Sequence, residues 1–145
     1  MKVATIGFTQ TSAKHFFDRL KMSGSEKLID VRLNNTSQLS GFAKAKDLEY
    51  FSWELCGVRY IHEPILAPTQ KILDAFKKQK GDWATYRVQF LDLMATRSIE
   101  TKVRMDVMDN SCLLCSEARP HNCHRSLVCE YLNTKWGSSL NVVHL

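Results

Sequence analysis

Short apolar runs alternate with helical patterns along the whole chain of 145 residues, and this alternation limits the possible folds most strongly. Five runs have this character: KVATIGF, KLIDVRL, VRYIHEP, SCLLC and NVVHL. Continuously apolar strands are typical of sheets buried on both faces, and strands separated by helices usually pair in parallel. The sequence therefore predicts one three-layer α/β domain over residues 1–145, with a mostly parallel sheet of about five strands and helices on both faces.

The segments between these runs have the spacing and the end signals of helices. Ser12 and Thr69 are suitable N-caps, Gly57 is a suitable stop, and a break is expected near Ser98. The expected helical segments are residues 12–24, 47–57, 69–81, 82–108 and 124–137.

Composition indicates a globular protein without a membrane span or signal peptide. Hydrophobic residues make up 44% of the chain, enough for a core, and no apolar run reaches the length of about 18 residues that a membrane span needs. The N-terminal stretch MKVATIGFTQ becomes polar too early for a signal peptide. We therefore expect a cytoplasmic protein, in which the five cysteines are reduced thiols and do not form a disulfide framework.

The net charge of +5 favours anionic partners. The densest basic group is Lys77, Lys78 and Lys80, and this group is more typical of a solvated helix face than of a nucleic-acid site. The expected partner is therefore a phosphate- or carboxylate-bearing small molecule or a nucleotide. Nucleic acid stays open, a membrane is not expected, and the sequence does not indicate an oligomeric state.

Polar and ionisable residues gather where the expected strands end. In a parallel sheet all carboxyl ends lie at one edge, where ligands bind. The residues expected at this edge are Gly7, Asp30, Arg32, His62, Cys115, Glu117 and His144. Asp30 and Arg32 are two apart on one strand, so their side chains share a face and a binding role is expected for Arg32.

The stretch CSEARPHNCHRS, residues 115–126, connects the fourth expected strand to the last helix. The helix begins near Cys123, so its free N–H groups and positive dipole end would face the same edge. A thiol at a helix start is activated, which makes Cys123 the candidate nucleophile. Arg125 is expected to grip an anion together with Arg32, and Glu117, His62, His124 or His144 would move protons.

The segments TIGF, LIDVR, VRYIHEP, LLCSEARPHNCHRSLV and VVHL resemble the domain-of-unknown-function family numbered four hundred and eighty-eight. The resemblance covers residues 3–145 and implies a prokaryotic α/β domain with a shared site of unassigned chemistry. It marks as motif positions Gly7, Asp30, Arg32, Phe42, Tyr60, His62, Cys115, Glu117, Cys123, His124 and Arg125. Similar proteins have Leu-Gly-Gly after the third strand, whereas this chain has a bulkier loop of Leu66, Ala67 and Pro68.

These residues also allow several other interpretations. Cys115 at the end of a buried strand is equally typical of a core residue, and Cys56, Cys112 and Cys129 are assigned to packing. Cys115, Cys123 and His124 offer three soft ligands, but their spacing matches no standard zinc motif, so no metal and no cofactor are expected. A compact rhodanese loop and a phosphatase loop, with arginine six positions after cysteine, are both missing.

Three functional hypotheses remain at this point. The first is an enzyme, a hydrolase or transferase using Cys123, in which Arg32, Arg125 and the helix start hold an anion. Asp30, Cys115, Gly7 and His144 would complete its binding site. The alternative is a non-catalytic module that binds a nucleotide or nucleic acid. The third is a structural or redox role for the cysteines alone.

Overall fold

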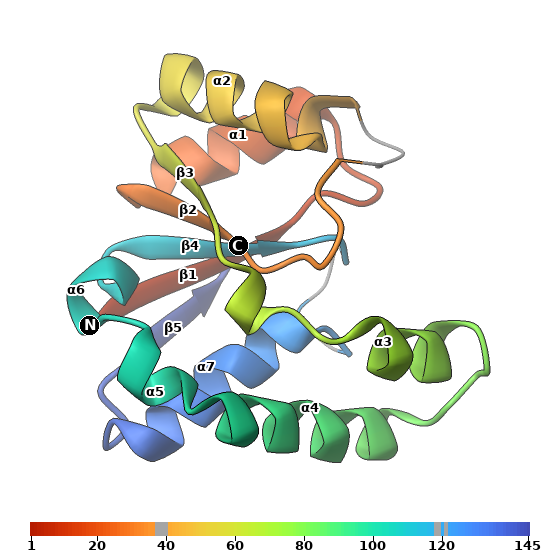
Figure 1. Cartoon of the computed structure of the whole chain (residues 1–145). Helices are drawn as coiled ribbons and strands as arrows, with labels where there is room; N and C mark the ends of the chain where they lie inside the picture. Colours follow the sequence, from red (N-terminus) through yellow and green to blue (C-terminus); the bar gives the residue numbers. More distant parts are fainter. Residues whose placement is uncertain (37–40, 118–119, 121) are drawn as a thin grey trace.

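The computed structural model describes residues 1–36, 41–117, 120 and 122–145. Five parallel strands form one sheet in the order β3-β2-β4-β1-β5 (Figure 1). The strands are β1 (Lys2–Gly7), β2 (Lys27–Asp30), β3 (Arg59–His62), β4 (Ser111–Cys115) and β5 (Asn141–His144). The predicted α/β domain with a parallel sheet is confirmed.

Helices cover both faces of the sheet (Figure 1). One face carries α1 (Ala13–Met22) and α2 (Ala45–Cys56), and the other carries α3 (Gln70–Lys77), α4 (Trp83–Arg97) and α7 (His124–Lys135). Short pieces complete the chain: η1 (Gly41–Ala43), η2 (Pro64–Leu66), α5 (Ile99–Lys102) and α6 (Met105–Met108).

Local signals in the sequence set the ends of these helices. The side chains of Ser12 and Thr69 accept hydrogen bonds from the backbone N–H groups of His15 and Ile72, as N-caps do. Gly57 ends α2 in the left-handed conformation. Ser98 is also left-handed, with φ 51°, and it separates α4 from α5 at the predicted break.

The sheet divides the interior into two hydrophobic cores. Phe16, Phe17 and Leu20 of α1 pack on one face, and Phe90 and Met94 of α4 pack on the other. Every residue of β4 is buried. Cys112 belongs to the first core and Cys115 to the second, as expected for residues three apart on a strand.

The carboxyl ends of the strands meet at one edge of the sheet. Gly7 is in register with Cys115, and Asp30 is in register with both His62 and Leu114. The chain leaves β1 toward α1 on one face and leaves the adjacent β4 toward α7 on the other. Where the connections of two adjacent strands run to opposite faces of a parallel sheet, a crevice opens between them at the edge of the sheet.

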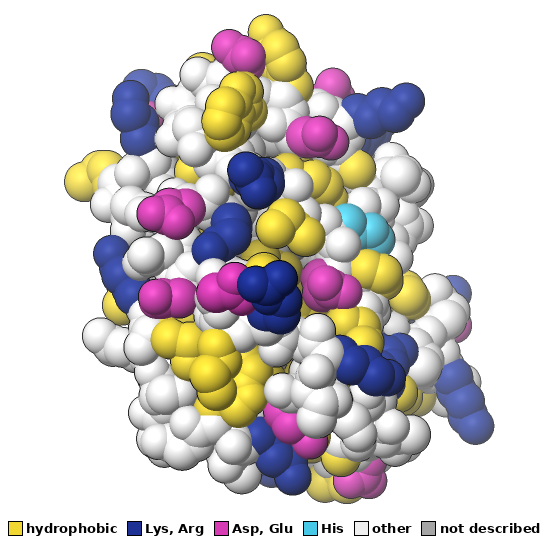
Figure 2. Space-filling view, turned by 60° about the vertical axis from the view of Figure 1, so that its left-hand side comes forward, with side chains coloured by type: hydrophobic (Ala, Val, Ile, Leu, Met, Phe, Trp, Pro, Cys, Tyr) yellow, Lys and Arg dark blue, Asp and Glu magenta, His cyan; other side chains and the backbone are white. Residues whose placement is uncertain are grey.

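The edge where the strands begin has a different character. Figure 2 turns this side forward and shows Lys, Arg, Asp and Glu side chains interspersed over it. The net positive charge is therefore not concentrated on this face as a single patch. Within the described part of the chain, no helix has both the length and the apolar character needed to cross a membrane.

Candidate functional site at the carboxyl edge of the sheet

A pocket of about 220 Å³ lies at the carboxyl edge of the sheet. One wall follows β2 and includes Arg32, and a second wall includes Cys115 and Glu117 after β4. The start of α7 adds Cys123 and His124. Another wall comes from the segments around α3 and α4: Pro68, Leu73, Phe76, Lys77 and Tyr86. Segments far apart in the sequence therefore converge on this cavity.

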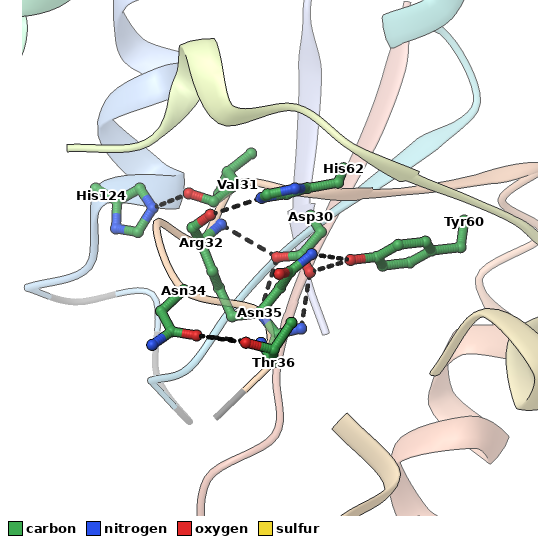
Figure 3. A network of polar contacts seen from close by, with 9 residues as sticks. All are labelled: Asp30, Val31, Arg32, Asn34, Asn35, Thr36, Tyr60, His62 and His124. Atoms are coloured by element: carbon green, nitrogen blue, oxygen red, sulfur yellow. Dashed lines mark hydrogen bonds and ion pairs between the residues drawn. The ribbon is translucent and has the colours of Figure 1, made fainter. Parts of the chain in front are cut away.

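A buried network around Asp30 holds the end of β2 (Figure 3). The Asp30 carboxylate is fully buried and accepts hydrogen bonds from Arg32 Nε at 2.8 Å, Arg32 Nη2 at 2.7 Å and the Tyr60 hydroxyl at 2.5 Å. Burial and the hydrogen bond to Asp30 raise the pKa of Tyr60 above its ordinary value, so its phenol stays a donor. The network fixes Arg32 in one orientation against the pocket.

Arg32 combines burial with an unused hydrogen-bond donor. The side chain is 3% exposed, and its guanidinium lies over the Phe8 ring at 5.1 Å. Its Nη1 is buried and has no hydrogen-bond partner among the described residues. An unsatisfied buried donor is costly, so this atom is suited to receive a ligand oxygen.

Two histidines bind the backbone carbonyls that follow β2 (Figure 3). His124 Nε2 lies 2.6 Å from the Val31 carbonyl oxygen, and His62 Nε2 lies 3.0 Å from that of Arg32. A carbonyl only accepts, so Nε2 carries the proton and Nδ1 of His124 keeps its lone pair. Burial lowers the pKa of His124 to about 4, which keeps the imidazole neutral at pH 7.

Cys115 and Cys123 lie together at the base of the pocket. The structure joins them in a disulfide with Cα atoms 7.6 Å apart, whereas the sequence predicts reduced thiols. The fold brings the end of β4 and the N-cap of α7 together, and the separation of eight positions in the sequence gave no signal of a disulfide. A ligand nitrogen of His124 and both sulfurs lie within 4.8 Å of one another.

The other three cysteines are free. Cys112 and Cys129 are buried, and burial raises the pKa of both thiols, that of Cys129 to about 12. Cys56 is half-buried on α2, and burial raises its pKa as well. These thiols are therefore poor nucleophiles, in agreement with the packing role predicted for them.

Arg125 lies behind the pocket lining and is not one of the lining residues. Its side chain is fully buried, and Nη1 donates to the Glu117 carbonyl at 2.5 Å and to Cys115 Sγ at 3.6 Å. Burial lowers its pKa to about 10. Gly7 makes room for this arrangement, because a Cβ there would overlap the Glu117 carbonyl oxygen. Arg125, for which the sequence predicts a grip on an anion, therefore holds the connection after β4 in this structure.

Lys77 and Glu117 form an ion pair of 2.6 Å beside the pocket. Both side chains are close to half exposed, so the pair is weak and can exchange with a ligand. The sequence predicts that Lys77 belongs to a solvated helix face. In the structure α3 places this half-exposed side chain in the pocket lining.

The structure brings together five of the predicted site residues as pocket lining: Arg32, Cys115, Glu117, Cys123 and His124. Asp30, Gly7, Arg125 and His62 lie behind this lining and hold it through the contacts given above. His144 lies on the edge strand β5, where its Nδ1 is 2.6 Å from Thr5 Oγ1. Burial and the charge of Arg125 lower its pKa.

Sequence reasoning missed the contribution of α3 and α4 to the pocket. Phe76 and Tyr86, whose rings are 4.9 Å apart, form an aromatic side of the cavity. Their helical spacing was visible but indicates only a buried stripe. The loop of Leu66, Ala67 and Pro68, which is bulkier than in similar proteins, contributes Pro68 to the pocket lining. Arg97 fixes this loop by donating to the Ala67 carbonyl at 2.7 Å.

Comparison with known proteins gives the family of the chain. The sequence model of the domain of unknown function DUF488 matches residues 12–132. The chain belongs to this family. The match includes the ends of β2, β3 and β4 and all of the pocket lining. Searches of curated proteins and of solved structures found no match to the chain.

Proposed function

We propose that this DUF488 protein binds a phosphate- or carboxylate-bearing small molecule in the pocket at the carboxyl edge of its sheet. The observation that carries the proposal is the buried Arg32, whose Nη1 has no hydrogen-bond partner among the described residues while its other nitrogens are fixed on Asp30. A planar guanidinium held in this way offers one directed, charge-assisted hydrogen bond to an oxyanion.

The start of α7 adds to the attraction for an anion. Cys123 is the N-cap of this helix of 12 residues, and both Cys123 and His124 line the pocket. The first N–H groups of a helix and its dipole favour negative charge at this end. Lys77 adds a cation that its exposed pair with Glu117 neutralises only in part.

The cysteine pair at the base of the pocket supports an enzyme of the hydrolase or transferase class. Both sulfurs lie next to a neutral imidazole, so the pocket holds an anion anchor and reactive groups together. A reducing compartment, such as the cytoplasm of a prokaryote, would keep the pair as thiols. A non-catalytic module for nucleotides would use the same pocket and show binding without turnover.

Thermal unfolding in the presence of inorganic phosphate, adenosine monophosphate or citrate tests the anion site. We expect at least one of them to raise the Tm of the reduced protein, because a ligand that binds only the folded state stabilises it. Arg32→Lys keeps the positive charge but lacks the planar guanidinium with its fixed N–H donors. This substitution should therefore weaken anion binding at least about tenfold.

Arg104→Lys is the matched control. Arg104 makes the same two-nitrogen contact with an aspartate two residues away, Asp106, but next to α6 and in solvent. This variant should bind the anion as the wild type does. Because Arg32→Lys disturbs a buried ion pair, the Arg32 Nε–H resonance of the wild type should also be followed by NMR during the titration. A Tm and a resonance that none of the three anions moves would overturn the proposal.

A further inference from the structure

We propose that Cys115, Cys123 and His124 of the reduced protein bind one zinc ion, with a fourth coordination position open to the pocket. Zinc binding itself does not depend on the proposed function, but the role of the open position does. In this arrangement Cys123 contributes its sulfur as a metal ligand, in place of the nucleophilic role expected from the sequence.

The three ligand atoms are already gathered in one place. Both sulfurs and a ring nitrogen of His124 lie within 4.8 Å of one another, although they come from the end of β4 and the first residues of α7. Tetrahedral zinc with Zn–S bonds of about 2.3 Å holds two sulfurs about 3.8 Å apart. Small rotations of the cysteine side chains of the reduced pair would reach this geometry.

The backbone spacing of the two cysteines suits a shared ion. Their Cα atoms are 7.6 Å apart. Cysteines joined by a disulfide usually have Cα atoms about 4.4–6.8 Å apart. An ion between the sulfurs lengthens the connection, so the wider backbone setting fits two thiolates on one metal.

His124 has the second interaction that metal-binding histidines require. Ligating histidines almost always donate their other ring N–H to a carbonyl or a carboxylate, which fixes the tautomer and the ring orientation. His124 Nε2 donates to the Val31 carbonyl at 2.6 Å, and its ring packs against Phe90. Nδ1 is therefore left with the lone pair for the ion.

Positive groups lie next to both sulfurs. Arg125 Nη1 lies 3.6 Å from Cys115 Sγ, and Cys123 is at the positive end of α7. Zinc binding to two thiols forms two Zn–S bonds and releases two protons to solvent. In the proposed site, Arg125 would therefore lie next to a metal-bound sulfur as well as holding the Glu117 carbonyl.

Two thiolates and one imidazole are a ligand set that suits zinc. Soft sulfur with imidazole selects this ion over magnesium or calcium, and three protein ligands with one open position are typical of catalytic zinc. The three residues all line the pocket of about 220 Å³ that also contains Arg32. A water molecule or an oxygen of the bound anion would take the fourth position.

The test is metal binding by untagged protein purified under reducing conditions, stripped with a chelator and reloaded. We expect one zinc ion per chain by elemental analysis and sub-micromolar affinity in competition with a chromophoric chelator. Cobalt(II) in place of zinc should give thiolate-to-metal charge-transfer absorption, which reports sulfur ligands directly. In the loaded protein, Cys115 and Cys123 should resist alkylation until chelator is added.

Single substitutions assign the ligands. Cys115→Ser, Cys123→Ser and His124→Gln should each weaken zinc binding at least about tenfold. Cys56→Ser and His15→Gln are the matched controls. Cys56 is half-buried on α2, and His15 is an exposed histidine on α1, so both variants should bind zinc as the wild type does.

Two results would overturn the inference. One is a reduced wild-type protein that takes up neither zinc nor cobalt, a result that does not depend on how well any variant folds. The other is equal loss of zinc in the ligand variants and the controls. Phosphate stabilisation is measured separately on metal-free and zinc-loaded protein. Zinc uptake without any anion effect would refute the proposed function alone, and an anion effect without zinc uptake would refute this inference alone.

Discussion

Arg32 and Arg125 are both buried at the carboxyl edge of the sheet, but their partners differ. Arg32 is held by a carboxylate and has one nitrogen, Nη1, without a hydrogen-bond partner among the described residues, whereas Arg125 donates to a backbone carbonyl and a sulfur. In the proposed function, Arg32 would bind the anion and Arg125 would position the connection after β4. Gly7 is part of the second task, because it leaves the space that Arg125 and Glu117 fill.

Gly7→Ala tests this close approach. The added Cβ would lie 2.6 Å from Arg125 Nη1 and would overlap the Glu117 carbonyl oxygen, so the connection after β4 must shift. We expect the free energy of unfolding to fall by about 1–3 kcal/mol, as for overpacked sites, measured by urea denaturation. Gly41→Ala is the control, since a Cβ there meets no atom of the described residues within 4 Å. Equal stability of the two variants would contradict this account of Gly7.

At the scale of elements, α3 is a short helix with an important position. It is eight residues long and has no fully buried residue, yet Leu73, Phe76 and Lys77 all line the pocket. A helix of this length is marginal without a cap and tertiary contacts. Its Thr69 cap and its packing on α4 through Phe76 and Tyr86 therefore keep one side of the pocket in place.

Removing this cap should affect stability and binding together. Thr69→Ala leaves the backbone N–H of Ile72 without its acceptor and should cost about 1 kcal/mol of unfolding free energy. Thr69→Ser keeps the hydroxyl and should stay close to the wild type. Chemical denaturation and a phosphate titration of both variants measure the two effects. If Thr69→Ala changed neither the unfolding free energy nor the phosphate affinity, the result would show that α3 does not depend on the Thr69 cap.

At the scale of the whole molecule, the pocket joins segments from both halves of the sequence. The end of β2, helix α3, the end of β4 and the start of α7 each contribute to its lining. The opposite face of the sheet, with α1 and α2, belongs to the other hydrophobic core. A ligand in the pocket would therefore contact the end of β2, helix α3, the end of β4 and the start of α7, but neither α1 nor α2.

Hydrogen exchange of the wild-type protein tests this arrangement. Saturating phosphate should slow amide exchange in residues 32–36, 70–77 and 122–126, because ligand binding suppresses local opening of the segments it contacts. Exchange in α1 and α2 should change much less. Uniform slowing over both faces would indicate general stabilisation by the salt and would argue against a ligand at this edge.

The sequence by itself determined the features that depend on neighbouring residues. The alternation of apolar runs and helical patterns predicted the parallel sheet, and Ser12, Gly57 and Thr69 predicted helix ends, because strand burial and capping are local effects. Parallel pairing also predicted that the strand ends, from Gly7 to Cys115, share one edge.

Only the tertiary structure decided which of these residues face the pocket. The buried position of Arg125, the contact between Cys115 and Cys123, and the wall formed by α3 depend on distances between segments that the sequence pattern does not contain. Side-chain partners across separate elements are set by how the helices pack on the sheet. The sequence names Cys115, Cys123 and His124 as possible soft ligands, but only the packing of α7 beside β4 brings their ligand atoms within 4.8 Å of one another.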